Sequence, residues 1–472
     1  MSLMRLSEAA RAIPAELRGE DRVFEAVSTD TRTLVPRTLF VALKGERFDG
    51  HDFLGEAASK HAAGALVQKA ESRIGESGLS DRLPLLVVED TKKSLGTLAA
   101  YWRKKFSLPL VALTGSNGKT TVKEMLASIL REACAAQSPV ADSRSPVLAT
   151  RGNLNNDIGV PLTLLELRPG HRYAVVEMGM NHAGEIRYLT RLAAPDVALI
   201  NNAGPAHLEF FGSVDAIARA KGEIFEGLRP GGTAVINADD RHAGLWRSLA
   251  GDRRIVEFGI ERPAAVSARY ALRYLESEIV VRTPHGEAQA VLKAPGLHNV
   301  RNALAASAAA AALEVPAPAI ARGLAGYAGF KGRLQRKTAL HGATLLDDTY
   351  NANPESVRAA VAVLAQAPGG KLLVLGDMGE LGAGGAQMHA DIGTLARESG
   401  IERLLALGDL SAQAARAFGA GGRHFTRIED LLAELENALA PDVTVLIKGS
   451  RFMQMERVVK RFETPATGHE SR

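Results

Sequence analysis

The chain has 472 residues, of which 46% are hydrophobic and 23% are charged, and its formal net charge is only +4. This length and hydrophobic content predict large buried cores and about three domains. Lys and Arg are scattered among nearly as many Asp and Glu, and no apolar run is long enough to cross a bilayer, which argues against nucleic-acid binding and membrane insertion.

The N-terminal part of the chain is predicted to form a small α/β domain. Strands are predicted over 39–43, 64–67 and 83–90, and a helix over 94–106 leads through Pro109 into the next region. The single cysteine, Cys134, cannot form an internal disulfide, which suits a reducing cytoplasm. We expect the first domain to span residues 1–106.

Two further domains are predicted from strand-like runs that alternate with helical patterns. In the second domain, expected over 107–330, the runs are 110–115, 173–179, 196–202 and 233–239. In the third, expected over 331–472, they are 344–348, 371–377, 403–409 and 443–449, with a polar tail after Phe462. Such alternation is typical of a parallel sheet with helices on both faces.

The stretch PLVALTGSNGKTT (109–121) predicts a phosphate-binding loop between a strand and a helix. Gly115 and Gly118 allow the main chain to turn, Lys119 supplies a positive charge for phosphate, and Thr120 offers a hydroxyl to Mg²⁺. The strict pattern requires a glycine where Leu113 stands, so a turn that merely caps the helix is the alternative. The expected nucleotide-binding residues here are Gly115, Ser116, Asn117, Gly118, Lys119, Thr120 and Thr121.

The shortened loop TGSNGKTT resembles that of the Mur ligases, the ATP-dependent amide-forming enzymes of peptidoglycan precursor synthesis. Further matches follow in the family's order: 151–165, 175–181, 202–209, 218–225, 298–306, 347–356, 375–382 and 448–451. YNANP and GDMGELG most resemble the branch that adds D-alanyl-D-alanine. No Asp-Asn-Pro-Arg, expected of the branch that adds the third amino acid, is present.

The resemblance implies an α/β fold of three domains: a central, doubly wound, mostly parallel sheet that carries the phosphate loop, a smaller N-terminal domain for the uridine nucleotide, and a Rossmann-like C-terminal ligase domain. It implies an acid–amino-acid ligase that joins D-alanyl-D-alanine to UDP-N-acetylmuramoyl-tripeptide through an acyl phosphate, giving the pentapeptide precursor, ADP and phosphate. It also implies a cytoplasmic monomer that acts in cell-wall biogenesis, and hence in cell shape and division. Lysine and diaminopimelate both remain open as the third residue of the tripeptide.

The resemblance further implies ATP and two Mg²⁺ ions. Thr120 and Glu177 match the ligands of one ion and His207 matches a ligand of the second, and Lys119, Glu177, His207 and Lys221 are the expected catalytic residues. Glu177 ends a predicted strand, where doubly wound sheets bind ligands, although a carboxylate that caps a turn is the alternative. Without the family match, His207 would be interpreted as an ordinary surface histidine with no metal to bind.

Lys221 lies in an apolar stripe of a predicted helix. Ile217, Ile224, Phe225 and Leu228 share its face, whereas Arg219, Glu223 and Glu226 point elsewhere. Burial lowers the pKa of a lysine, and a neutral amine can react with CO₂ to give an anionic carbamate. Several Mur ligases carry a carbamylated lysine at the matching position, so we expect carbamylated Lys221 to bind the second Mg²⁺. A lysine that extends its ammonium group into water is the alternative.

Other site residues follow from the resemblance. For the nucleoside and γ-phosphate they are His298, Asn299, Asn302, Arg333 and Asp348, although Asn299 could be only a helix N-cap. The expected substrate-binding residues are Thr29, Asp30, Thr31, Arg32, Lys44, Gly45, Asp49, Gly50, His51, Asn155, Asn156, Tyr350, Asn351, Asn353, Lys448, Ser450 and Arg451. Ordinary turn chemistry at Asn155 and Asn156, and a solvated basic turn at Arg451, are the alternatives.

Three other classes of protein are alternatives. Another amino-acid-adding Mur ligase or a folylpolyglutamate synthase would share the loop and the metal ligands. A GTPase switch would need Asn-Lys-x-Asp, which the sequence lacks, and a nucleic-acid-dependent ATPase would need a basic, aromatic-rich surface. Binding surfaces on three domains imply hinges, expected near 107–109 and 329–333.

Overall fold

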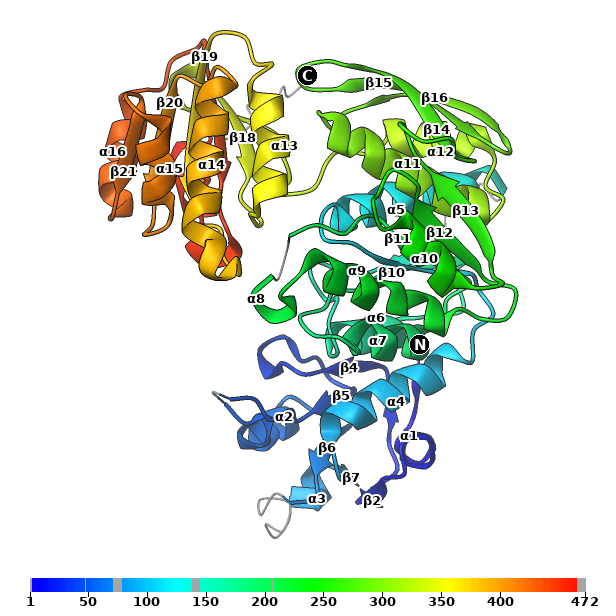
Figure 1. The fold of residues 1–472 in the computed structure, drawn as a ribbon. Coiled ribbons are helices and arrows are strands. Elements are labelled where there is room, and N and C mark those ends of the chain that lie inside the picture. The colour runs from blue at the N-terminus through cyan, green and yellow to red at the C-terminus, as the bar shows by residue number, and fades with distance from the viewer. Residues whose placement is uncertain (1, 47, 71–78, 138–144, 206–207, 465–472) are drawn as a thin grey trace, which may run out of the picture.

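The computed structural model describes residues 2–46, 48–70, 79–137, 145–205 and 208–464. The chain forms three α/β domains, with the central domain between the N-terminal and C-terminal ones (Figure 1). Every strand named in the sequence analysis is present, and none of the described helices is both long and apolar enough to cross a membrane.

The N-terminal domain is built on a five-stranded sheet of order β2-β7-β6-β5-β4, parallel except for β2. Its strands are β2 (Glu16–Arg18), β4 (Ala26–Ser28), β5 (Thr38–Val41), β6 (Gly64–Gln68) and β7 (Leu85–Val88), and β1 (Met4–Arg5) pairs with β3 (Val23–Phe24) beside it. Its helices are α1 (Leu6–Ala12), α2 (Leu54–Ser59), α3 (Leu79–Arg82) and α4 (Thr91–Arg103).

The central domain has a six-stranded, wholly parallel sheet of order β13-β12-β11-β8-β10-β9. The strands are β8 (Leu110–Thr114), β9 (Val147–Ala149), β10 (Tyr173–Glu177), β11 (Val197–Ile200), β12 (Thr233–Asn237) and β13 (Arg254–Phe258). The helices are α5 (Lys119–Gln137), α6 (Gly159–Leu165), α7 (Glu185–Ala193), α8 (Leu208–Phe211), α9 (Val214–Gly222), α10 (Ala243–Ala250), α11 (Leu297–Ala312) and α12 (Ala317–Ala325).

Helices cover both faces of this sheet, which explains its uninterrupted apolar strands. Leu110 and Ala112 of β8 pack into the cluster that contains α4, α6 and α7, whereas Val111 and Leu113 pack into the cluster that contains α5, α11 and α12. Because successive side chains of a strand point to opposite faces, a strand covered on both sides must be apolar at every position.

A three-stranded antiparallel sheet within the central domain was missed by the sequence analysis. It comprises β14 (Ser267–Leu272), β15 (Ser277–Thr283) and β16 (Gly286–Leu292). Alternate residues such as Ile279, Val281 and Leu292 are buried in the same cluster as α11 and α12. The expected strand and helix alternation is therefore interrupted between β13 and α11.

The C-terminal domain has a sheet of order β17-β18-β22-β19-β20-β21, parallel except for β17. The strands are β17 (Gln335–Thr338), β18 (Thr344–Asp348), β19 (Gly370–Gly376), β20 (Arg403–Leu407), β21 (Gly422–Phe425) and β22 (Val443–Lys448), and the helices are α13 (Pro354–Leu364), α14 (Gly385–Glu398), α15 (Ser411–Phe418), α16 (Ile428–Glu436) and α17 (Glu456–Phe462). The three-domain α/β architecture is thus confirmed.

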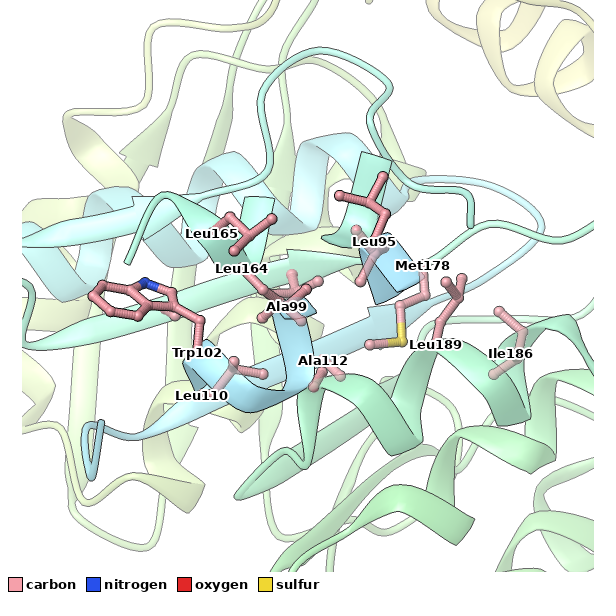
Figure 2. Close-up of a cluster of buried hydrophobic side chains, with 14 of the residues drawn as sticks. Leu95, Ala99, Trp102, Leu110, Ala112, Leu164, Leu165, Met178, Ile186 and Leu189 are labelled. Atoms are coloured by element: carbon pink, nitrogen blue, oxygen red, sulfur yellow. The ribbon is translucent and has the colours of Figure 1, made fainter. Parts of the chain in front are cut away.

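One apolar cluster runs without interruption from the N-terminal domain into the central domain. Figure 2 shows Leu95, Ala99 and Trp102 of α4 beside Leu110, Ala112, Leu164, Leu165, Met178, Ile186 and Leu189 of the central domain. The Trp102 indole donates to Leu167 O at 3.1 Å, and the buried Arg103 guanidinium donates to Ala193 O at 3.1 Å. These contacts argue against the hinge expected at 107–109.

We predict that Trp102→Ala costs about 3–5 kcal/mol of unfolding free energy, since it empties a large buried volume. Trp102→Phe keeps an aromatic ring but removes the indole donor to Leu167 O, which still accepts from Arg168 Nη1 at 2.7 Å, so the cost should be smaller, about 0.5–1.5 kcal/mol. Urea unfolding measures both values. The control, Phe48→Ala at a position 64% exposed, should stay within about 0.5 kcal/mol of the wild type.

Hydrogen exchange gives this prediction a second readout. Because the cluster is shared, Trp102→Ala should lower the protection of β6 and of β8 together. Loss of protection confined to the N-terminal domain would mean that the two domains unfold independently.

Candidate nucleotide and metal site

The loop between β8 and α5 has the geometry of a phosphate-binding loop. Gly118 has φ +80°, and a Cβ there would lie 2.2 Å from Asn302 Oδ1, so only glycine fits. Leu113, where the strict pattern has glycine, is a fully buried residue of β8. The glycine loop therefore begins at Gly115, two residues later than in the strict pattern, because the strand continues through Thr114.

Lys119 begins α5 and folds back over the loop. Its Nζ donates to Gly115 O at 2.6 Å. Burial lowers the pKa of Lys119, Glu177 raises it, and Arg333 lowers it. The three side chains thus lie within electrostatic reach of one another. Thr120 and Thr121 follow in the first turn of α5 and are buried.

A chain of asparagine side chains holds the loop from behind. Asn201 Nδ2 donates both to Asn117 O at 2.9 Å and to Asn302 Oδ1 at 3.0 Å. Asn302 Nδ2 in turn donates to Asn299 Oδ1 at 3.1 Å. Asn202 Oδ1 accepts from Asn117 N at 2.8 Å. The phosphate loop is therefore fixed by polar groups of α11 and of the segment that follows β11, and not by its own sequence alone.

Asn299 is not the N-cap of α11, so that alternative is wrong. The N-cap is Gly296, and Asn299 lies in the first turn, where its Nδ2 donates to Pro295 O at 2.8 Å. Asn201 and Asn202 were missed by the sequence analysis. Their signal was available, because they end the run 196–202, which was predicted to be a strand parallel to the loop's strand.

Glu177 ends β10, the strand next to β8, and is 2% exposed. Its Oε1 accepts from Asn155 Nδ2 at 2.8 Å, whereas its Oε2 is buried without a hydrogen-bond partner. A buried carboxylate oxygen without a donor is costly unless a cation or another donor approaches it. This orphaned atom fits a metal site at the end of β10.

Lys221 is 2% exposed at the end of α9, so the alternative with its ammonium group in bulk water is wrong. Burial lowers the pKa of Lys221 well below its usual value, and the charge of Lys119 lowers it further. The predicted apolar stripe is confirmed, since Ile217, Ile224, Phe225 and Leu228 are all buried.

One neighbour of Lys221 differs from the prediction. The α-helix ends at Gly222 and continues as a 3₁₀ helix over Glu223–Gly227. Glu223 was expected to point away from the buried face but is itself only 8% exposed. Its carboxylate accepts from Gly184 N at 3.0 Å and Arg187 N at 3.2 Å, at the N-terminus of α7. The change of helical pitch and the free N–H groups of α7 explain this burial.

The expected metal ligands are only partly described. His207 lies outside the described residues. In the part of the chain that the structure describes, no cluster of three or more His, Cys, Asp and Glu side chains is arranged to hold a metal ion. A Mg²⁺ site at Glu177 would consequently draw its other ligands from hydroxyl, phosphate and water oxygens, as Mg²⁺ commonly does.

A cavity of about 660 Å³ opens beside the phosphate loop, between the central and C-terminal domains. All five residues expected at the nucleoside and γ-phosphate line it: His298, Asn299, Asn302, Arg333 and Asp348. Asn117, Gly118 and Thr121 line it as well. Its size and position suit a nucleotide.

Two basic residues of the C-terminal domain face this cavity. Arg333 stacks over the Tyr350 ring at 4.2 Å, and its buried Nε has no partner. Lys448 donates to Asp348 Oδ2 at 2.6 Å, in an ion pair whose side chains are 1% and 9% exposed. Lys448, expected at the dipeptide, thus lines the nucleotide cavity.

The C-terminal domain also touches the phosphate loop directly. Asn353 is the N-cap of α13, and its Nδ2 donates to Asn117 Oδ1 at 2.8 Å. Asn117 Nδ2 donates to Glu355 Oε2 at 3.1 Å. Sequence reasoning missed Glu355, although it belongs to the matched segment 347–356. The two domains therefore meet at the loop itself.

The remaining residues expected to bind the acceptor or the dipeptide lie at three places. Asn156 Oδ1 accepts from Gly159 N at 2.9 Å, which is turn chemistry at the start of α6. Ser450 Oγ donates to Ala352 O at 3.1 Å. Arg451, after β22, is exposed and pairs with Glu456 at 3.1 Å, while Asn351 is exposed in the loop between β18 and α13.

The residues expected to bind the uridine nucleotide gather on the N-terminal domain, away from the 660 Å³ cavity. They are Thr29, Asp30, Thr31, Arg32, Lys44, Gly45, Asp49, Gly50 and His51. The buried His51 ring accepts from Gln68 N through Nε2 at 3.0 Å, so its Nδ1 carries the proton and donates to Asp49 Oδ1 at 2.6 Å. Asp30 accepts from Arg32 N at 2.9 Å. These bonds shape the two loops.

Comparison with known proteins agrees with this arrangement. Family models match residues 23–103 (Mur ligase family, catalytic domain), 113–310 (Mur ligase middle domain) and 332–451 (Mur ligase, glutamate ligase domain). UDP-N-acetylmuramoyl-tripeptide–D-alanyl-D-alanine ligase of Escherichia coli (strain K12) is 42% identical over 474 residues, which cover 99% of this chain and all of that one.

Two solved structures are similar over nearly the whole chain. One, described as UDP-N-acetylmuramoylalanyl-D-glutamyl-2,6-diaminopimelate–D-alanyl-D-alanyl ligase from Acinetobacter baumannii, is 37% identical with a TM-score of 0.85 and covers 97% of this chain and 98% of its own. MurF ligase from Thermotoga maritima in complex with ADP is 27% identical with a TM-score of 0.78, covering 92% and 96%. The chain belongs to the Mur ligase family.

Proposed function

We propose that this chain is an ATP-dependent ligase that joins D-alanyl-D-alanine to UDP-N-acetylmuramoyl-tripeptide and releases ADP and phosphate. The observation that carries the proposal is a phosphate loop beside a cavity shared by two domains, with a buried carboxylate oxygen that has no partner, Glu177 Oε2, on the neighbouring strand. The substrates come from the similarity along the full chain to ligases of that name.

The reaction couples phosphate transfer to amide formation. A carboxylate oxygen of the tripeptide bonds to the γ-phosphorus of ATP, and ADP leaves. The amine of D-alanyl-D-alanine then bonds to the carbonyl carbon of the acyl phosphate and loses a proton, and phosphate leaves. Positioning and charge neutralisation are the main tasks of the protein in such a transfer.

The residues around the loop suit these tasks. Free backbone N–H groups at the start of α5 and the Lys119 ammonium would bind the phosphates. The unpaired Nε of Arg333 gives the C-terminal domain a donor in the same cavity. His298, Asn299 and Asn302 line the cavity for the nucleoside, as proposed from the family, and Asp348 lies beside them.

Mg²⁺ fits this donor set. Thr120 and Glu177 would hold one ion, and His207 with carbamylated Lys221 would hold the second. Bound Mg²⁺ would offset the charge of the phosphate and carboxylate oxygens that must approach each other. The unpartnered Oε2 of Glu177 and the buried, neutral-prone amine of Lys221 support the assignment from this chain's own residues.

We further propose the domain limits 1–106, 107–330 and 331–472, which enclose the three segments matched by family models. The uridine nucleotide would be bound by Thr29 to Arg32, Lys44, Gly45 and Asp49 to His51. The acceptor and the dipeptide would be surrounded by Asn155, Asn156, Tyr350, Asn351, Asn353, Lys448, Ser450 and Arg451. We propose a monomeric cytoplasmic enzyme of peptidoglycan synthesis.

The deciding experiment measures phosphate release from ATP and Mg²⁺. We expect release to require both UDP-N-acetylmuramoyl-tripeptide and D-alanyl-D-alanine, and mass spectrometry to find the pentapeptide. The diaminopimelate tripeptide is the first acceptor to test, followed by the lysine form, because the Acinetobacter baumannii relative is named for diaminopimelate. Release that another amino acid or a folate substrate stimulates, and the dipeptide does not, would refute the proposal.

The proposed carbamate can be tested with ¹³C-bicarbonate. Because burial lowers the pKa of Lys221, its amine is neutral more often than that of an exposed lysine, and a carbamate carbon signal should appear that Lys221→Met lacks. Lys221→Met should lower kcat by about 10- to 100-fold, the range found for groups that support a metal site. Lys93→Met, at a side chain 82% exposed, should keep both the signal and the activity. An identical spectrum for Lys221→Met would disprove carbamylation.

His298 predicts a specific loss of stability in acid. Burial, together with the charges of Lys448 and Arg301, lowers the pKa of His298 from 6.5 to about 4. Between pH 6.5 and 4 the unfolded chain therefore binds a proton that the folded protein does not, so the unfolding free energy falls as pH falls. From pH 7.5 to 5 this amounts to about 1–2 kcal/mol.

Urea midpoints at the two pH values test this linkage. His298→Gln should lose less stability on acidification than the wild type, whereas His182→Gln, at a side chain 65% exposed, should behave like the wild type. Equal losses in the wild type and His298→Gln would show that His298 is not the group concerned.

A further inference from the structure

Lys123 is a buried cation that the proposed chemistry does not use. It lies one helical turn after Lys119 in α5 and its side chain is fully buried. Three groups face its ammonium: Thr150 O at 2.6 Å, Glu124 Oε1 at 2.9 Å and the Phe330 ring, whose centroid is 5.5 Å away. An ammonium group has three donors, so these contacts compensate its loss of hydration.

The first contact leads to the proposed metal ligand. Thr150 begins the loop that follows β9, and its Oγ1 accepts from Glu177 N at 2.9 Å. Asn155, in the same loop, donates to Glu177 Oε1 at 2.8 Å. Lys123 thus binds the backbone of the loop after β9. That loop in turn binds Glu177 twice, at the backbone N–H and at the carboxylate.

The third contact leads to the linker between the central and C-terminal domains. Gly329, with φ +86°, and Gly332, with φ +72°, flank Phe330 and permit backbone conformations that other residues rarely adopt. Phe330 O accepts from Arg333 N at 3.0 Å. Phe330 is therefore the point at which a linker with two glycines is attached to the helix of the phosphate loop.

We propose that Lys123 is a positioning residue that ties α5 to two separate parts of the site: Glu177 through Thr150, and the interdomain linker through Phe330. One consequence is a fixed relation between Thr120, on the same helix, and Glu177. The other is a fixed pivot from which Arg333 reaches the cavity. The inference rests on the proposed function only in treating Glu177 as a metal ligand.

The test separates the two connections with three variants of the full-length protein. Lys123→Met keeps the length and apolar stem of the side chain and removes its charge and donors. Thr150→Val removes the hydroxyl that accepts from Glu177 N, and Phe330→Leu removes the aromatic face. The readouts are Mn²⁺ affinity in the presence of ADP, followed by electron paramagnetic resonance, and hydrogen exchange of peptides that cover 329–333.

We expect Lys123→Met to raise the Mn²⁺ dissociation constant about 10-fold or more, in the range found for groups behind metal ligands, and to speed exchange in the linker. Thr150→Val should change Mn²⁺ affinity alone, and Phe330→Leu should change linker exchange alone. Ser307→Ala is the control, because it removes a buried hydroxyl that donates to Ala303 O on the neighbouring helix α11 and should change neither readout.

The proposal would be overturned if Lys123→Met had the same Mn²⁺ affinity and the same linker exchange as the wild type. Faster exchange spread evenly over all three domains would also overturn it, because that is the mark of a merely structural lysine. If Lys123→Met does not fold, Thr150→Val and Phe330→Leu test the proposal. It would be refuted if the two variants changed Mn²⁺ affinity and linker exchange to the same extent. Neither readout needs turnover, so a wild type without ligase activity would refute the proposed function and leave this test intact.

Discussion

Burial of charge at the carboxyl ends of β8 and β10 is the constraint on which the rest of the site depends. Lys119, Lys123, Lys221 and Glu177 gather there, and their charges are not equally compensated. Lys123 has three partners, and Lys119 donates to a loop carbonyl, but Glu177 Oε2 has no donor and Lys221 no counter-ion among the described residues. A site with uncompensated groups of both signs is suited to a ligand that brings both signs, as a nucleotide phosphate with a divalent cation does.

This constraint explains why the scaffold around the loop is rigid. Helices on both faces of the central sheet bury every residue of the inner strands β8, β11 and β12. The apolar cluster that includes α4 joins the N-terminal domain to the same body. The C-terminal domain has its own two clusters and joins through a linker with two glycines at positive φ. The structure therefore favours one flexible connection, at 329–333, over the two that the sequence suggested.

The sequence predicted most strands and the phosphate loop because both depend on local patterns, such as the apolar run of β8 and the glycines that follow it. It also predicted the buried stripe around Lys221, since helical spacing sets that face. It could not predict the burial of Glu223, which depends on the N-terminus of α7, nor that of Lys123, whose three partners come from separate segments. β15 alternates buried and exposed residues, as an antiparallel strand does. The sequence analysis missed it because it expected only parallel strands and helices in this domain.

The contacts of Asn117 connect nucleotide binding to the position of the C-terminal domain. Its main chain is held by Asn201 and Asn202 of the central domain, while its side chain bonds to Asn353 and Glu355 of the C-terminal domain. A carboxylate from the far domain thus lies beside a loop that is built to receive phosphate. Negative charge added at the loop changes the energy of that contact, and, by linkage, the position of the domain changes the affinity of the loop for phosphate. The residues that recognise phosphate and those that join the domains are the same, so the two events are energetically coupled.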